Sequence, residues 1–147
     1  GAGEQRAVSS SDYFIGRIIM SFKTLAVTTA IIAFLLGLGY LFFGSIIVGR
    51  WEIQPTESVL LLGRRLAALY IGLAIIFFLA RSAPVSTVRT SLSIGAAVAL
   101  SLLALLGICE LLLGHVGHGI IASVAIEALL AIGYIGILLT ERKNKSA

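Results

Sequence analysis

Long apolar stretches alternate with short polar links along this chain. The apolar stretches cover about residues 24–48, 57–80, 90–113 and 120–140. An α-helix needs about 20 mostly apolar residues to cross the roughly 30 Å hydrocarbon core of a bilayer, so each stretch is long enough. Because the links between them are short, consecutive helices must run in opposite directions. The pattern predicts an all-α integral membrane protein, an up-down bundle of four transmembrane helices with short loops.

The composition agrees with a protein that lies in the bilayer. Of 147 residues, 59% are hydrophobic and 12% are charged, and the mean hydropathy is +1.06. Soluble domains carry about twice that share of charge. Four spans account for most of the chain, which leaves no room for a soluble catalytic domain. The net charge of +4 comes from basic residues that flank the spans, so we expect no nucleic-acid partner.

Three segments follow from this pattern. Residues 1–23 form a polar or interfacial N-terminal segment, residues 24–140 form the membrane domain, and residues 141–147 form a basic C-terminal tail. Met20 is the only methionine, which makes residues 1–19 a candidate for an added or processed extension.

The distribution of Lys and Arg predicts the orientation of the bundle. One side holds the N-terminus, the 81–89 turn and the C-terminus; its basic residues are Arg6, Arg17, Lys23, Arg81, Arg89, Arg142, Lys143 and Lys145. The opposite side holds only Arg50, Arg64 and Arg65. Loops rich in Lys and Arg stay in the cytoplasm, so both termini are predicted to be cytoplasmic.

Arg64 and Arg65 interrupt the second apolar stretch. The uncharged run that follows, residues 66–80, is about 15 residues or roughly 22 Å long, which is too short to cross the bilayer. The helix must therefore extend back through the arginine pair. A guanidinium group at membrane depth costs roughly 2.5–3.5 kcal/mol and usually marks a partnered or functional position.

Two carboxylates are predicted to lie in the same layer as this arginine pair. Glu127 follows the start of the fourth stretch by about two turns, and Glu110 precedes the end of the third by about one turn. Opposite charges at one depth relieve each other's desolvation. We predict that Arg65 pairs with Glu127, while Glu110 takes Arg64 or reaches water.

This predicted polar cluster has three open interpretations. It holds the bundle together or sends its arginines to the lipid headgroups, it binds a ligand or ion, or it takes part in catalysis. For a binding site, Tyr70, Ser123 and Tyr134 are the candidate lining residues, because they share helix faces with the charged positions or lie near them.

The link between the third and fourth stretches contains His115 and His118. A His-x-x-His spacing with Glu110 as a third ligand is compatible with a metal ion. The flanking glycines favour a flexible turn with unliganded histidines, so the sequence predicts no metal and no cofactor. Cys109, the one cysteine, lies among aliphatic residues and is predicted to be a buried thiol. No spacing of a nucleophile and a base and no phosphate-binding loop occurs, and we therefore predict no catalytic residue.

One stretch resembles a known group of proteins. Gly-Arg-Arg-Leu-Ala-Ala-Leu-Tyr-Ile-Gly-Leu-Ala at 63–74, followed by Phe-Phe-Leu-Ala-Arg at 77–81 and Ser-Thr-Val-Arg at 86–89, resembles a pattern in small uncharacterised bacterial four-helix inner-membrane proteins that are DoxX-like. The resemblance covers about residues 64–139. It implies a multi-pass protein of the bacterial inner (plasma) membrane and little chemistry.

These observations lead to three functional hypotheses. The first is a non-enzymatic accessory or interaction module stabilised by a buried Arg/Glu cluster. The second is a protein that binds or transports a small molecule, lipid or ion through an outward-facing polar cavity. The third, which rests on the resemblance, is a membrane subunit of a quinone- or thiol-linked oxidoreductase. The expected partners are the lipid bilayer, a second copy or another membrane protein, and a small amphiphilic ligand.

Overall fold

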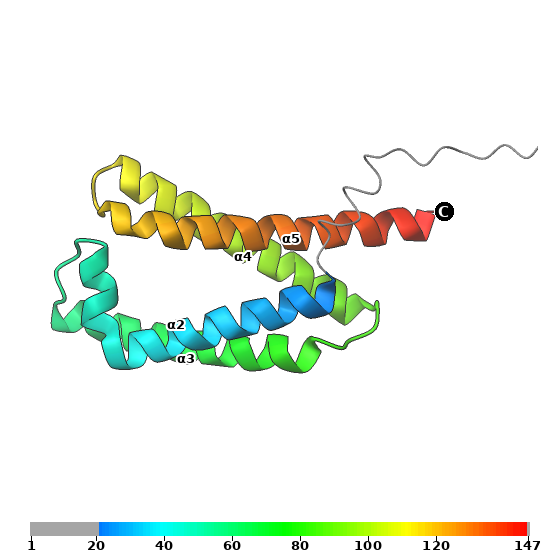
Figure 1. Cartoon of the computed structure of the whole chain (residues 1–147), viewed down its shortest axis with the longest axis horizontal. Coiled ribbons are helices and arrows are strands. Elements are labelled where there is room, and N and C mark those ends of the chain that lie inside the picture. Colours follow the sequence, from blue (N-terminus) through cyan, green and yellow to red (C-terminus); the bar gives the residue numbers. More distant parts are fainter. Residues whose placement is uncertain (1–20, 147) are drawn as a thin grey trace, which may run out of the picture.

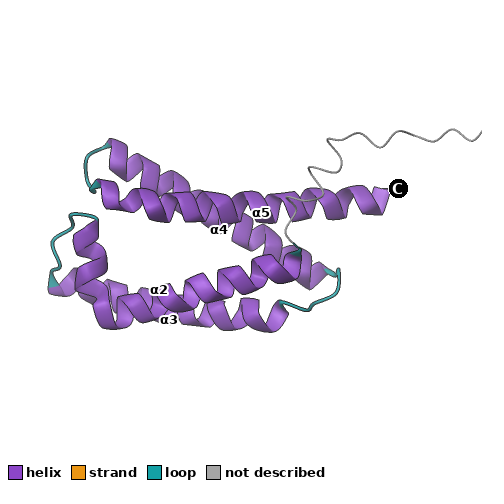
Figure 2. Cartoon of the chain, viewed as in Figure 1, coloured by secondary structure: helices purple, strands orange, loops and turns teal. Residues whose placement is uncertain are grey.

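The described part of the protein consists of four long helices and one short helix. The computed structural model describes residues 21–146, with side chains up to residue 144. The elements are α2 (Phe22–Arg50), α3 (Glu57–Ala80), α4 (Thr87–Leu112), the short 3-10 helix η1 (His118–Ile120) and α5 (Ile121–Ser146) (Figure 1). Regular structure in the described part is helical throughout, as Figure 2 shows.

The described residues confirm the prediction of an all-α protein with four long apolar helices. Each of them is long and apolar enough to cross a membrane. The predicted boundaries of the second span are those of α3, and α2 and α4 begin two or three residues before their predicted spans. Helix α5 continues without a break through most of the predicted basic tail. The predictions for residues 1–20 lie outside the described residues.

Hydroxyl side chains begin three of these helices. The side chains of Ser21, Thr56 and Ser86 accept hydrogen bonds from backbone N–H groups three residues later, at N···O distances of 3.2, 3.4 and 3.3 Å. Each bond satisfies one of the N–H groups that the first turn of a helix leaves unpaired. The polar links of the sequence therefore end one helix and start the next.

Helix α4 ends in a Schellman motif at Gly114. The N–H of His115 donates to the carbonyl of Glu110, and the N–H of Gly114 donates to that of Leu111. Gly114 has a φ of 74°, a backbone conformation that glycine adopts without steric cost. This turn reverses the chain so that η1 and α5 can run back along α4.

The helices form two hairpins. Helix α3 packs along α2, and α5 packs along α4 (Figure 1). In the first hairpin Gly37 allows close approach, since a β-carbon there would lie 3.1 Å from the carbonyl oxygen of Ala67. In the second, Gly107 lies against Val124. Small residues let helix backbones approach each other closely where lipid provides no hydrophobic drive for association.

The hairpins join through α2 and α5 at the end of the molecule that holds Ser21, the α3–α4 turn and Glu141, here called the terminal end. Tyr134 is fully buried and donates a hydrogen bond of 2.9 Å to Oγ1 of Thr29. Its ring lies 5.8 Å from that of Phe77. Leu25 and Phe22 complete this core together with Ala26, Ala30, Ala97, Leu130 and Ile137.

A buried ion pair lies beside this core. Nη2 of Arg89 on α4 is 2.7 Å from Oε1 of Glu141 on α5, with side-chain exposures of only 18% and 13%. The guanidinium group also lies over the ring of Phe22, 4.4 Å from its centroid, and Nη1 donates to the carbonyl of Ala83 at 3.4 Å. One arginine therefore connects α4, α5, α2 and the α3–α4 turn.

The opposite end, here called the loop end, is closed by the two links. Phe43 interrupts α2 with φ −127° and ψ 28°, next to a Gly44-Ser45 pair of the kind at which helices kink. The last turns of α2 therefore bend toward the α4–α5 hairpin (Figure 1). There the N–H of Gly117 donates to the carbonyl of Trp51 at 2.8 Å. A side chain at Gly117 or Gly119 would collide with Glu52 or Arg50, so the glycines permit this docking.

We expect the Arg89–Glu141 pair to be required for stability. Glu141→Ala leaves the Arg89 guanidinium buried without its counter-charge, and we expect it to lower the free energy of unfolding by about 3 kcal/mol. The measurement is reversible unfolding in mixed micelles. The exchanged double variant, Arg89→Glu with Glu141→Arg, should recover at least half of the loss. As a control, Glu57→Ala removes an exposed carboxylate and should leave unfolding unchanged. Equal effects of Glu141→Ala and Glu57→Ala would contradict the assignment.

Candidate functional site

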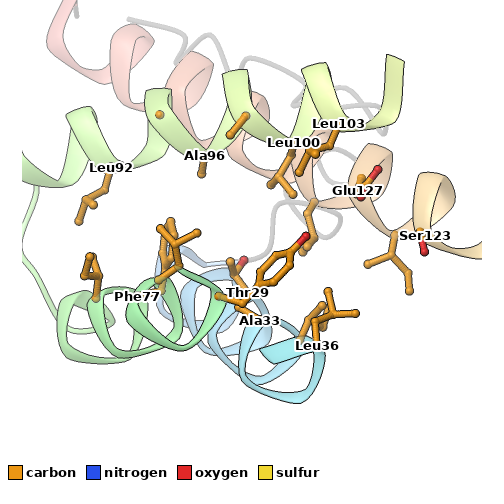
Figure 3. Close-up of a pocket in the computed structure, with 18 of the residues that line it drawn as sticks. Thr29, Ala33, Leu36, Phe77, Leu92, Ala96, Leu100, Leu103, Ser123 and Glu127 are labelled. Carbon is orange, nitrogen blue, oxygen red and sulfur yellow. The ribbon is translucent and has the colours of Figure 1, made fainter. Parts of the chain in front are cut away.

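A cavity of about 730 Å³ lies between the two hairpins. All four long helices contribute to its wall, and Trp51 in the α2–α3 link reaches it as well. Figure 3 shows Thr29, Ala33 and Leu36 of α2 on one side and a row of α4 residues on the other. The α4 row consists of Leu92, Ala96, Leu100 and Leu103. The cavity exists because the hairpins pack together at the terminal end and dock through their links at the loop end.

The cavity opens sideways between α3 and α4. These two helices make at most marginal contact with each other, whereas each packs along its hairpin partner. Leu73 and Ile76 on the α3 wall are exposed, and so are Ser91 and Ala99 on the α4 wall. Both outer helix faces also carry large exposed aliphatic side chains, which suit contact with acyl chains. The opening therefore lies beside the outer helix faces that carry these aliphatic side chains.

The charged lining residue and the tyrosine and tryptophan rings lie toward the loop end, whereas the hydroxyl residues Thr29, Thr87 and Ser91 line the part toward the terminal end. Glu127 and Ser123 lie one turn apart on α5 at one end of the cavity, and Leu92 and Phe77 lie toward the other (Figure 3). The Tyr40 ring is stacked on that of Tyr70, with centroids 6.0 Å apart and an interplanar angle of 7°. Its edge contact with Trp51 spans 6.3 Å between centroids.

Glu127 is near this aromatic group and has no counter-charge among the side chains of residues 21–144. Its carboxylate interacts electrostatically with the hydroxyl groups of Tyr40 and Tyr70. Within residues 21–144, the ion pairs are Arg64 with Glu57, Arg89 with Glu141 and His115 with Glu110. Glu127 takes part in none of them. It is half-buried, and it is the one Asp, Glu, Lys, Arg or His among the described lining residues.

The predicted Arg/Glu cluster is not assembled in this structure. Arg65 is exposed on α3, and in the part of the chain with described side chains it forms no ion pair with Glu127. Arg64 lies 3.9 Å from Glu57, with side-chain exposures of 53% and 94%, a contact that contributes little. Neither arginine lines the cavity. Both point away from it because Gly63 and Ala67 occupy the buried face of α3.

Glu110 pairs with a residue of its own link. Its Oε2 lies 2.7 Å from Nδ1 of His115, and both side chains are largely accessible. His118 begins η1 and is exposed. No group of three His, Cys, Asp or Glu side chains converges in the described residues. Cys109, predicted to be buried, is exposed on α4 because the small residues Ala104 and Gly107 take the face toward α5.

Two of the three candidate lining residues lie on the cavity wall. Tyr70 and Ser123 line it, whereas Tyr134 lies in the core beneath it and reaches it only through its hydrogen bond to Thr29. Sequence reasoning missed Tyr40 and Trp51 as lining residues. The available signal was their position at the end of the first span, level with Tyr70 and Glu127 in an up-down bundle.

Comparison of the chain with protein-family models, with curated proteins and with solved structures found no match. The resemblance to DoxX-like proteins therefore stays a prediction. The site must be interpreted from its own chemistry.

A double-mutant cycle tests whether Arg65 and Glu127 act independently. Since the structure holds them apart, we expect the effects of Arg65→Leu and Glu127→Gln on the free energy of unfolding to add, with a coupling energy below about 0.5 kcal/mol. The measurement is unfolding in mixed micelles for the four members of the cycle. A coupling of 1 kcal/mol or more, on the order expected for residues in contact, would show that the pair forms after all.

Proposed function

We propose that this protein binds an amphiphilic small molecule from the bilayer in the cavity between its hairpins. The observation that carries the proposal is the cavity itself. Its volume of about 730 Å³ falls within the range of roughly 300–1,000 Å³ typical of ligand sites. Its lining also has the usual composition of such sites, mostly apolar with a few polar groups.

The shape of the cavity supports a ligand that arrives from the membrane. The opening between α3 and α4 lies along the apolar length of the spans, where lipid tails are the natural surroundings. The part near the terminal end is lined mostly by aliphatic side chains, together with the hydroxyl residues Thr29, Thr87 and Ser91, and the Glu127 carboxyl group lies near the loop end with the aromatic rings. A molecule with an apolar body and a polar head matches this division.

The proposed orientation follows the distribution of basic residues. We propose that the protein lies in the bacterial inner membrane, as the resemblance implies, and that both termini are cytoplasmic, because Lys23, Arg81, Arg89 and Arg142 lie at the terminal end. The polar part of the cavity then lies toward the outer leaflet. This arrangement fits the uptake or presentation of a ligand from that leaflet.

The hypothesis of an accessory module depended on the predicted Arg/Glu cluster, which the structure does not contain. An accessory module held together by an Arg/Glu cluster needs that cluster, and Arg65 and Glu127 do not pair in the structure. The buried ion pair that the structure does contain, Arg89 with Glu141, lies within the α4–α5 hairpin at the other end of the molecule. Glu127 is thus left as an intramembrane carboxylate in a cavity, a position that usually indicates a binding role.

Filling the cavity tests the proposed function. Trp51 is the only tryptophan of the chain and lines the cavity, so its fluorescence reports a quencher bound there. The probe is a neutral single-chain alcohol with bromine atoms on its chain. We expect saturable quenching in the unmodified protein and at least tenfold weaker binding in Gly95→Phe, because Gly95 lines the cavity and a side chain there meets no atom within 4 Å.

The control for this experiment is Gly136→Phe. Gly136 also has open space around it but lies outside the cavity wall, so its replacement should leave quenching unchanged. Equal quenching in both variants would place the probe in the surrounding micelle, and the proposed function would fail.

A further inference from the structure

The polar end of the cavity has the chemistry of a cation site. It combines one carboxylate, that of Glu127, with the rings of Tyr40, Tyr70 and Trp51. From this combination we infer that the ligand is a lipophilic organic cation, such as a quaternary ammonium or phosphonium ion with a large apolar body. The inference rests on the proposed function and specifies its ligand class.

The first argument is the unbalanced charge of Glu127. A carboxylate in an apolar, half-buried position is costly unless a counter-charge or hydrogen bonds compensate it. The wall of the cavity, as far as its residues are described, offers Glu127 no lysine, arginine or histidine. Arg64 and Arg65, the nearest basic residues along α3, are exposed and do not line the cavity. A ligand that carries its own positive charge would supply the missing partner.

The second argument is the arrangement of the aromatic rings. Stacked Tyr40 and Tyr70, with Trp51 at the edge of Tyr40, bring three rings together at the end of the cavity where Glu127 lies. The face of an aromatic ring attracts a cation, most strongly when the cation has a weak hydration shell, and quaternary ammonium ions are recognised in this way. Gly63 makes room for the Tyr40 ring, since a β-carbon there would lie 3.2 Å from it.

The third argument excludes the common lipids of the membrane. A phospholipid head group carries a phosphate, which would meet the Glu127 carboxylate without any basic side chain on the described wall to balance it. A fatty acid carries the same sign of charge as Glu127. Among amphiphiles, a monovalent cation without a phosphate is therefore the class that the site favours by charge.

Tetraphenylphosphonium and tetraphenylborate test this inference, because they have nearly the same size and shape and opposite charges. Binding to the full-length protein in neutral detergent is measured by titration calorimetry, with protein-free micelles subtracted. We expect saturable binding of the phosphonium ion, a loss of at least tenfold in affinity in Glu127→Gln, and no loss of affinity for the borate ion in this variant, because the substitution removes a like charge. Glu110→Gln is the matched control, since it removes a carboxylate near the loop end that does not line the cavity.

Two tyrosine variants test the aromatic part. Tyr70→Phe keeps the ring and should keep phosphonium binding within about twofold, whereas Tyr70→Leu should weaken it several-fold, in line with the usual strength of a cation–π contact. Thermal unfolding of each variant shows that it is folded. Equal losses of phosphonium affinity in Tyr70→Phe and Tyr70→Leu would show that the aromatic ring of Tyr70 does not contact the cation.

The outcomes separate this inference from the proposed function. If the brominated alcohol binds in a Gly95-dependent manner but the phosphonium ion binds equally to the unmodified protein and Glu127→Gln, the cation inference is wrong and the proposed function stands. If neither probe binds in a way that depends on Gly95 or Glu127, both are wrong. Borate binding that equals phosphonium binding and also depends on Glu127 would overturn the inference as well.

Discussion

The packing of α2 against α5 around Tyr134 is the constraint on which the rest of the structure depends. Each hairpin is stabilised internally by close helix contacts, but the hairpins meet mainly through this core, its Tyr134–Thr29 hydrogen bond and the adjacent contact of Arg89 with the Phe22 ring. All three features lie toward the terminal end. Because α3 and α4 scarcely touch, the hairpins diverge from there until their links dock near Trp51 and Gly117. The cavity is the space that this two-point attachment leaves open.

The charged residues have different roles in the structure from those that their positions in the sequence suggested. Arg89 and Glu141 looked like ordinary membrane-flanking residues, yet they form the most buried ion pair among the described side chains. The carboxylate oxygens of Glu141 have no aligned hydrogen-bond partner in residues 21–144, so burying this pair costs free energy. In return, Arg89 on α4 contacts both α5 and α2. Arg64 and Arg65 looked exceptional and lie on the exposed sides of α3. Glu127 is the charge that the fold places in the cavity.

The structure also divides the cavity into two chemically distinct parts. Aliphatic side chains of α3 and α4 surround the region near the terminal core, and aromatic rings gather beside Glu127 at the loop end. The kink at Phe43 contributes to this division, because it turns the end of α2 and brings Trp51 over the cavity. The proposed binding of an amphiphile uses both parts, and the proposed preference for a cation uses the aromatic end.

The sequence alone determined the number, length and helical nature of the spans, because apolar stretches of about 20 residues between short polar links leave the backbone few other structures in a bilayer. It also predicted that Arg64, Arg65, Glu110 and Glu127 lie in one layer, since the rise per residue of a helix is fixed, and it named Tyr70 and Ser123 as lining candidates. It could not determine the rotation of each helix about its axis. Rotation depends on which small residues meet, as Gly37 meets Ala67 and Gly107 meets Val124. That choice turned Arg65 outward and Glu127 toward the cavity, and only the tertiary structure decided it.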